Sequence, residues 1–376
     1  MRETAVYIHI PFCDHKCIYC DFYSIINYKD VANFIFAFQK EIKFIAEENH
    51  YNRIITSIFF GGGTPSFMEP HYVGNIIKII KSQFHVADDV EITLETNPGT
   101  VNQKKIARFM KAGINRLSIG IQSFDDDDLK FLTRIHNSAS ARKTVLDSVE
   151  AGIENVSIDL IFNLPGQTKD KWKSNLLKAI DLPLKHISAY SLILEKGTIL
   201  NKMVLDGKVE MGNDDHDADL YEITIDFLTK HGFKQYEVSN FSLPGYECRH
   251  NNSYWHYNDY FGFGPSAHSF VDGKRWWNYS SLKFYIENVN KKGNAIRGLE
   301  ELTDSMMLNE YIMLALRSSG LDINKINEKF GEDWIIDNHK KIKKMEQKGY
   351  LTSDDNFIKF TPKGYAVCDE ILKNII

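Results

Sequence analysis

The sequence predicts an α/β protein whose larger part is a partial (βα)6 barrel, related in plan to the TIM barrel, followed by a small C-terminal α+β domain. Six short apolar segments alternate with stretches in which apolar residues recur at helical spacing. Parallel strands need such helical crossovers between them. Six strand-helix units are fewer than the eight of a closed barrel, so we expect a barrel that is open on one side.

Composition and charge restrict the functions that this chain can have. The 376 residues are 43% hydrophobic, which is ordinary for a globular protein, and 45 basic against 50 acidic residues give a formal charge of -5. This balance does not favour binding to nucleic acid through a general basic surface. The first residues lack a signal peptide pattern, and five cysteines, three of them clustered, do not form a disulfide framework. We therefore expect a cytoplasmic protein.

Each predicted strand is short and apolar, and most are followed by a helical stretch. The first predicted helix covers residues 31–48, with Phe34, Phe38, Ile42 and Ile45 at helical spacing, and another covers residues 73–84. The predicted strands cover residues 6–10, 57–60, 91–95, 116–121, 156–162 and 186–192. Because parallel barrels place their active sites at the C-terminal ends of the strands, the residues at those ends are the candidates for chemistry.

Polar residues and glycines gather at these strand ends. After the second strand, three consecutive glycines indicate a sharp bend or a close approach of the backbone to a ligand. Buried Glu95 and Asp159 would be costly without a partner, and a cationic or hydrogen-bonding ligand would offset that cost. In chain order the strand ends carry the Cys13–Cys20 loop, Gly61 to Thr64, Glu95 with Asn97 and Pro98, Gln122, Asp159 with Asn163, and Tyr190 with Ser191.

Three cysteines on one short loop indicate a metal centre. Cys13, Cys17 and Cys20 have the spacing CxxxCxxC and follow a strand that Pro11 ends. Structural zinc needs four ligands, and a fourth is not obvious here, although His9 or His15 could complete a zinc knuckle. An iron-sulfur cluster with three cysteine ligands would keep one iron open for a reactive ligand.

This cysteine loop resembles the signature of the radical S-adenosylmethionine (SAM) superfamily, and the strands in their order resemble the oxygen-independent coproporphyrinogen III oxidase family. The resemblance implies a barrel of the radical SAM type, with a 4Fe-4S cluster on the three cysteines and SAM at the open iron. It also implies contacts to SAM: Tyr7 near the methionine moiety, Tyr19 in the cluster loop, Gly63 and Thr64 under the amino group, and Glu95, Gln122, Arg134 and Asp159 at the remaining positions.

The acidic run from Asp125 to Asp128 has a simpler interpretation. Carboxylates in the first turn of a helix complement the helix dipole. We expect this run to start a helix and to have no chemical role.

An aromatic and histidine-rich segment, which we delimit as residues 236–300, follows the barrel at residues 1–235. Its rings could form a packed aromatic core, but histidine among flat apolar rings is also what a heme pocket needs. The string from His250 to Trp255 matches HNxxYW, a signature of the HemW-type heme chaperone branch. The resemblance implies that His250 contacts heme, with Cys248, His256 and His268 as competitors. The segment contains Cys248, His250, Tyr254, Trp255, His256, Tyr257, Tyr260, Phe261, Phe263, His268, Trp276, Trp277 and Tyr279.

Residues 301–376 are predicted to form a winged-helix-like domain. Helices are expected over residues 306–316, 323–330 and 334–348, with a hairpin around residues 350–360. Lysines surround Ile342 and Met345 in the third helix, which is typical of a solvated amphipathic helix. We therefore expect no binding to nucleic acid.

Two functions agree with the resemblance, and we favour a heme chaperone that transfers heme to an acceptor protein over a coproporphyrinogen III oxidase. The decarboxylases have a further cysteine two positions after the third, where this chain has Phe22. They also carry an N-terminal extension, whereas the first strand here begins almost at Met1. The implied partners are heme, its acceptor and an electron donor if the cluster is reduced. Peripheral association with membrane acceptors is compatible with this function.

Overall fold

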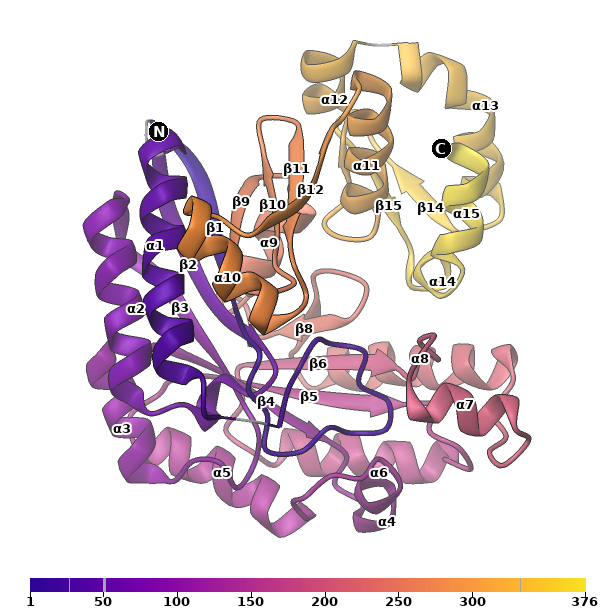
Figure 1. Ribbon diagram of the computed structural model, residues 1–376. Coiled ribbons are helices and arrows are strands. Elements are labelled where there is room, and N and C mark those ends of the chain that lie inside the picture. Colours follow the sequence, from indigo (N-terminus) through magenta and orange to yellow (C-terminus); the bar gives the residue numbers. More distant parts are fainter. Residues whose placement is uncertain (27, 50–51, 332) are drawn as a thin grey trace.

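One large sheet organises the computed structural model, which describes residues 1–26, 28–49, 52–331 and 333–376 (Figure 1). Its first six strands stand side by side in chain order and pair in parallel, which confirms the predicted barrel strands. These strands are β1 (Arg2–Ile10), β2 (Arg53–Gly62), β3 (Val86–Thr96), β4 (Arg116–Gln122), β5 (Asn155–Phe162) and β6 (His186–Ser191).

Helices cover the outer face of the parallel strands (Figure 1). The predicted apolar residues of the first helix, including Phe34, Phe38 and Ile42, are fully buried. The acidic run behaves as predicted, because Asp125 caps the helix that follows it and accepts hydrogen bonds from two backbone N–H groups. The helices are α1 (Val31–Asn49), α2 (Pro70–Gln83), α3 (Gln103–Ala112), α4 (Asp126–Phe131), α5 (Ser138–Glu150) and α6 (Lys169–Ile180), with a short 3-10 turn, η1 (Pro65–Phe67), after β2.

Further strands extend this sheet at both ends. Beside β6 lie β8 (Asn240–Ser242) and β7 (Lys234–Gln235). On the other side, β9 (Asp259–Phe263) pairs in parallel with β1, followed by the antiparallel β10 (His268–Val271), β11 (Lys274–Asn278) and β12 (Ile296–Glu301). The aromatic segment thus contributes strands to both ends of the barrel sheet. The remaining helices of this region are α7 (Ile199–Leu205), α8 (Asp214–Lys230), α9 (Arg249–Trp255) and α10 (Leu282–Lys292).

Two buried charged residues join the extension to the barrel. Arg53 of β2 forms ion pairs with Asp259 at the start of β9 and with Asp272 in the turn after β10. Glu41 of α1 accepts hydrogen bonds from the Gly264 N–H at 2.9 Å and the Tyr285 hydroxyl at 2.6 Å. Burial raises the pKa of Glu41 to about 7, although these donors favour its ionised form.

The C-terminal part has the predicted winged-helix-like arrangement, with helices around a small sheet in the order β13-β15-β14. Ile342 of the lysine-rich helix is buried while the lysines on either side of it are exposed, as expected for a solvated amphipathic helix. The elements are α11 (Asp304–Leu316), β13 (Leu321–Asp322), α12 (Ile323–Phe330), α13 (Asp333–Gln347), β14 (Leu351–Ser353), β15 (Phe357–Phe360), α14 (Pro362–Ala366) and α15 (Cys368–Ile375).

The core of this domain is continuous with the sheet extension, since Tyr257 and Phe270 pack into it. Within the described ranges, no helix combines the length and the apolar character needed to cross a membrane.

Replacing Arg53 by Gln should lower the free energy of unfolding by about 3 kcal/mol, because it leaves the largely buried Asp259 carboxylate without its partner. Urea unfolding would measure this effect. The matched control is Arg108→Gln, which breaks an exposed pair with Glu69 and should cost less than about 1 kcal/mol. Equal losses in the two variants would contradict a structural role for the buried pair.

Candidate functional site

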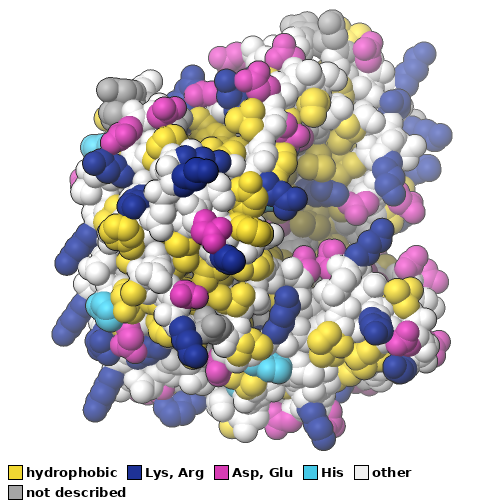
Figure 2. Space-filling model, viewed as in Figure 1, with side chains coloured by type: hydrophobic (Ala, Val, Ile, Leu, Met, Phe, Trp, Pro, Cys, Tyr) yellow, Lys and Arg dark blue, Asp and Glu magenta, His cyan; other side chains and the backbone are white. Residues whose placement is uncertain are grey.

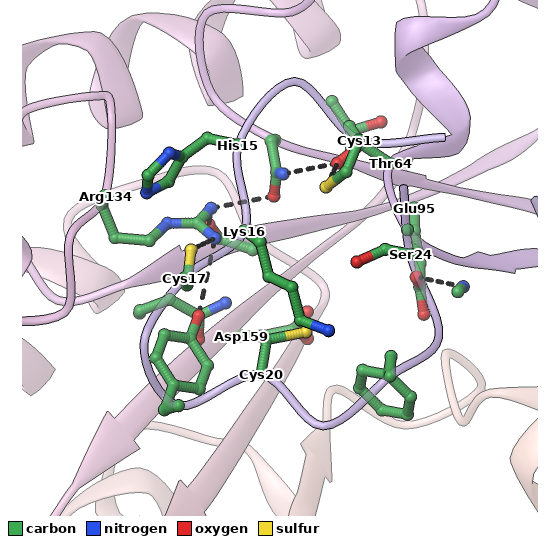
Figure 3. Close-up of a pocket in the computed structure, with 18 of the residues that line it drawn as sticks. Cys13, His15, Lys16, Cys17, Cys20, Ser24, Thr64, Glu95, Arg134 and Asp159 are labelled. Atoms are coloured by element: carbon green, nitrogen blue, oxygen red, sulfur yellow. Dashed lines mark hydrogen bonds between the residues drawn. The ribbon is translucent and has the colours of Figure 1, made fainter. Parts of the chain in front are cut away.

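The C-terminal ends of the barrel strands surround a cavity that also contacts the cysteine loop (Figure 3). Parallel pairing brings these ends to one edge of the sheet, which is why residues far apart in sequence meet here. Tyr7 lies beside this cavity rather than in its lining, and His250 lies elsewhere. Ten of the residues expected from the sequence line the cavity: Cys13, Cys17, Tyr19, Cys20, Gly63, Thr64, Glu95, Gln122, Arg134 and Asp159.

The three cysteines of the loop are free thiols that face this shared space. The Cys13 Sγ lies 3.0 Å from the Thr64 hydroxyl oxygen, and Arg134 Nη1 donates to the Cys17 Sγ at 3.5 Å. Burial raises the pKa of the Cys20 thiol. In the described part of the chain, no three His, Cys, Asp or Glu side chains are close enough together to hold a single metal ion.

The glycines after β2 let the backbone approach the cysteine loop closely. The N–H groups of Gly63 and Thr64 donate to the Ile10 and Phe12 carbonyls at 2.8 Å each. A Cβ atom on Gly63 would lie 2.7 Å from the Phe12 carbonyl oxygen, which is closer than side chains allow. The glycine run therefore holds the start of the cysteine loop, in addition to lining the cavity.

Arg134 links the cysteine loop to the strand ends. Its Nη2 donates to the Asn97 side-chain oxygen at 2.8 Å and to the Gly120 carbonyl at 2.6 Å, while Nη1 lies 3.5 Å from the Tyr19 hydroxyl. Its Nε is buried without a hydrogen-bond partner. Arg134, which only the family resemblance had indicated, is thus a buried cation with one N–H donor that has no hydrogen-bond partner.

Two residues that position the site were not assigned a role from the sequence. Asn97, one of the strand-end residues, donates a hydrogen bond from its side-chain amide to the Thr64 hydroxyl at 2.8 Å. Thr133 has a φ of 57° and accepts the Ile18 N–H at 3.2 Å, so it holds the cysteine loop. Such a φ is strained for a β-branched residue, and strain of this kind concentrates at functional sites. No sequence pattern reveals it.

Two carboxyl groups line the cavity from β3 and β5, the strands on either side of β4. Burial raises the pKa of Glu95 to about 8, and the charge of Asp159 adds to this rise, while the Gly62 N–H donates to Glu95 at 3.2 Å. Burial also raises the pKa of Asp159, which accepts a hydrogen bond from Ser118 at 3.2 Å. A cationic ligand between these groups would favour their ionised forms.

The histidine of the HNxxYW motif is only 2% exposed and faces the barrel interior. Its Nδ1 lies 3.1 Å from the Ser57 hydroxyl and its Nε2 lies 2.9 Å from the Tyr254 hydroxyl. The His250 ring stacks on Phe59, and burial lowers its pKa to about 3. Both ring nitrogens are therefore engaged, and a bond from His250 to iron would require one of these hydrogen bonds to break.

Trp255, the last residue of the HNxxYW motif, lines a second cavity. This cavity has a volume of about 750 Å³, within the range of ligand sites. It adjoins the first, sharing Tyr19, Phe22, Glu95, Gln122 and Asp159, and the C-terminal domain closes its far side. Figure 2 shows the hollow between the C-terminal domain and the region of α7 and α8, with hydrophobic side chains around it. None of the competitors Cys248, His256 and His268 is in its described lining.

Comparison with known proteins agrees with this arrangement. Residues 7–178 match the model of the Radical SAM superfamily, and residues 302–367 match that of the HemN C-terminal domain. The "Heme chaperone HemW" of Bacillus subtilis is 33% identical over 98% of this chain and 97% of its own length. This chain belongs to the HemW family of radical SAM proteins.

Two further comparisons show how far the HemW family likeness extends. A zebrafish (Danio rerio) protein, "Radical S-adenosyl methionine domain-containing protein 1, mitochondrial", is 32% identical over 100% of this chain and 87% of its own length. The structure of Escherichia coli coproporphyrinogen III oxidase (HemN) superposes with a TM-score of 0.85 at 22% identity, covering 100% of this chain and 90% of that one. The latter likeness shows a shared fold.

Membership of the radical SAM superfamily implies a 4Fe-4S cluster and SAM, and the first cavity suits both. Three thiols supply the ligands that such clusters use. The unpartnered Arg134 Nε offers a donor to an anionic group, and Glu95 with Asp159 offers acceptors to a cationic one. SAM carries groups of both kinds.

Replacing Cys17 by Ser should abolish the iron-sulfur absorbance of the anaerobically reconstituted protein, because a ligand of the cluster is lost. Absorbance spectra and iron content would measure this. Cys368→Ser is the matched control, since this thiol lies in the C-terminal domain, and it should keep the full cluster. A full cluster in the Cys17 variant would show that the ligand assignment is wrong.

Stability should fall in acid partly because of His250. Its pKa is lowered from 6.5 to about 3 in the folded protein, so the unfolded chain binds a proton that the folded chain does not. The folded state therefore keeps its full stability above pH 6.5, where His250 is neutral in both states, and loses stability progressively as the pH falls toward 3. His250→Gln should therefore reduce the slope of unfolding free energy against pH, between pH 6 and 4.5, by about 1.4 kcal/mol per pH unit.

Urea unfolding at several pH values would measure these slopes. The matched control is His85→Gln, which makes the same replacement at an exposed position. Equal slopes for wild type and the His250 variant would contradict a buried neutral histidine.

Proposed function

We propose that this chain binds heme and transfers it to an acceptor protein in the cytoplasm, and that it holds a 4Fe-4S cluster and SAM next to the heme site. The observation that carries this proposal is the large cavity beside the cluster site, which combines the HNxxYW residue Trp255 with a wall from the C-terminal domain. The relatives named heme chaperones support the same activity. All five cysteines are free thiols, which suits a reducing compartment.

The walls of the large cavity suit a flat, apolar macrocycle. Tyr221, Trp255 and Tyr365 supply aromatic surface from three separate elements, and Ile161 and Leu192 supply aliphatic surface from the barrel. Large ring systems gain most from such contacts because they bury much apolar area at little entropic cost. Heme is therefore the ligand class that we assign to this cavity.

The mouth of the cavity suits a transient protein partner. Phe22 is 60% exposed and Ile193 is 68% exposed, and both line the cavity. Exposed apolar side chains beside a ligand site are typical of surfaces that contact another protein. We propose that the acceptor, in solution or at a membrane surface, docks here and takes heme directly from the cavity.

The residues indicated by the family resemblance are proposed to hold SAM in the first cavity. Tyr7 packs behind the site, where the Glu95 charge and burial raise the pKa of its hydroxyl. When bound, the cluster and SAM supply one-electron chemistry, and the protein contributes position and electrostatics. Because the two cavities share Tyr19, Phe22 and Glu95, occupancy of one alters the walls of the other. An electron donor is needed wherever the cluster is reduced.

His250 supports heme binding through the helix that carries it. Its hydrogen bond to Ser57 and its stacking on Phe59 hold α9 on the barrel, and α9 ends at Trp255 in the heme cavity. We therefore propose that loss of His250 weakens heme binding by displacing Trp255. Direct ligation by His250 is the competing assignment, and it predicts a changed heme spectrum.

The second candidate function is oxidative decarboxylation of coproporphyrinogen III, favoured by the fold shared with the Escherichia coli enzyme. Phe22 stands where the decarboxylases have a cysteine, and its ring lines both cavities. A phenylalanine in place of this cysteine favours heme binding over decarboxylation. Turnover of coproporphyrinogen III by the reconstituted protein would overturn our ranking.

Heme titration followed by the Soret band would test the proposal. Trp255→Ala should weaken heme binding at least about tenfold, because a stacking wall is lost. His250→Gln should weaken it less and keep the position of the Soret band. Trp277→Ala is the matched control, since this ring packs against Gly298 and His268 outside the described cavity lining. Unchanged binding in the Trp255 variant would contradict the assigned cavity.

A further inference from the structure

The heme cavity has an acidic wall with one basic side chain. Arg317 is the sole cation among the residues that line it in the described part of the chain. Heme carries two propionate groups, and unpaired carboxylates around them would oppose its binding. The lining carboxylates are Asp21, Glu95, Asp159, Glu195, Asp217 and Asp369. The propionate edge of heme therefore has a single cationic partner in the described lining.

The backbone of Arg317 is fixed where the C-terminal domain meets the barrel region. Its carbonyl accepts the Val238 N–H at 2.9 Å, and Val238 lines the same cavity. Arg317 caps the end of α11, so its side chain starts from a well-defined point. The guanidinium group is thus held at the junction, rather than on a free loop.

The ion pair between Arg317 and Asp369 can be broken at little cost in free energy. The guanidinium group pairs with Asp369, whose side chain is 69% exposed, while that of Arg317 is 25% exposed. Ion pairs with such an exposed partner contribute little to stability. Arg317 contacts Asp369 through one nitrogen, whereas a propionate brought into the cavity could accept a planar, bidentate contact away from solvent, where it is stronger.

We propose that Arg317 binds a propionate of heme and so orients the macrocycle, with its propionate edge toward the C-terminal domain and its apolar edge toward the barrel. This inference rests on the heme-binding function proposed above. On the barrel side, Ile161, Phe162 and Leu192 offer apolar surface, and the carboxyl groups of Glu95 and Asp159 disfavour a propionate there. The C-terminal domain thus selects the orientation in which heme enters, and the exposed Asp369 releases Arg317 when heme arrives.

Binding of heme and of heme dimethyl ester, in which both propionates are blocked, would test this proposal in the full-length reconstituted protein. Arg317→Gln should weaken heme binding about tenfold or more, because a charged hydrogen bond is lost. The same variant should leave binding of the dimethyl ester unchanged. Arg317→Lys should restore part of the heme affinity, since it keeps the charge but not the bidentate geometry.

The matched control is Lys340→Gln, which removes one positive charge from the exposed face of α13 in the same domain. It should bind both ligands as the wild type does. Iron-sulfur absorbance and circular dichroism would verify that each variant is folded.

Three other results would overturn the inference. Unchanged heme binding in Arg317→Gln would contradict the proposed contact with a propionate. Equal weakening of binding for heme and its dimethyl ester would indicate that Arg317 has a purely structural role. In both cases the wild type still binds heme, so the proposed function stands. A wild type that binds neither ligand would instead contradict the proposed function itself, and the inference with it.

Discussion

The parallel pairing of β1 to β6 is the constraint on which the rest of the structure depends. It brings six strand ends to one edge, so that a cysteine loop, a glycine run and two carboxyl groups meet although they are far apart in the chain. The segment after β2 can approach the start of the cysteine loop because Gly63 has no side chain, and the Gly63 N–H donates to the Ile10 carbonyl. The cysteine loop is therefore positioned by backbone contacts as much as by its own residues.

Buried charge is concentrated where this edge forms the first cavity. Arg134 has a donor without a partner, and Glu95 and Asp159 have raised pKa values, so the site has electrostatic interactions left to make. Elsewhere in the barrel, buried charges such as Glu41 and Arg53 are paired and hold elements together. The contrast separates residues that maintain the fold from residues that await a ligand.

The HNxxYW motif combines contacts to the barrel and to the large cavity within six residues. His250 is enclosed by Ser57, Tyr254 and Phe59, and it attaches α9 to the barrel. Trp255, at the other end of the same helix, lines the large cavity. The histidine of the motif therefore packs inside the protein, while its tryptophan lines the large cavity together with Arg317 of the C-terminal domain.

The sequence by itself determined the barrel strands, the winged-helix-like domain, the helix that starts at the acidic run and the strand-end residues of the first cavity, because periodicity and strand-end position are local properties. Arg134 was indicated by the family resemblance alone. The sequence did not reveal the strands that extend the sheet at both ends, since β7 to β12 are short and join the barrel only where β8 pairs with β6 and β9 pairs with β1, which are distant in the chain. Only the tertiary structure decided that His250 faces inward and that Arg317 joins the cavity wall. The direction of a side chain and the meeting of distant elements depend on packing across the whole sheet, which no local pattern contains.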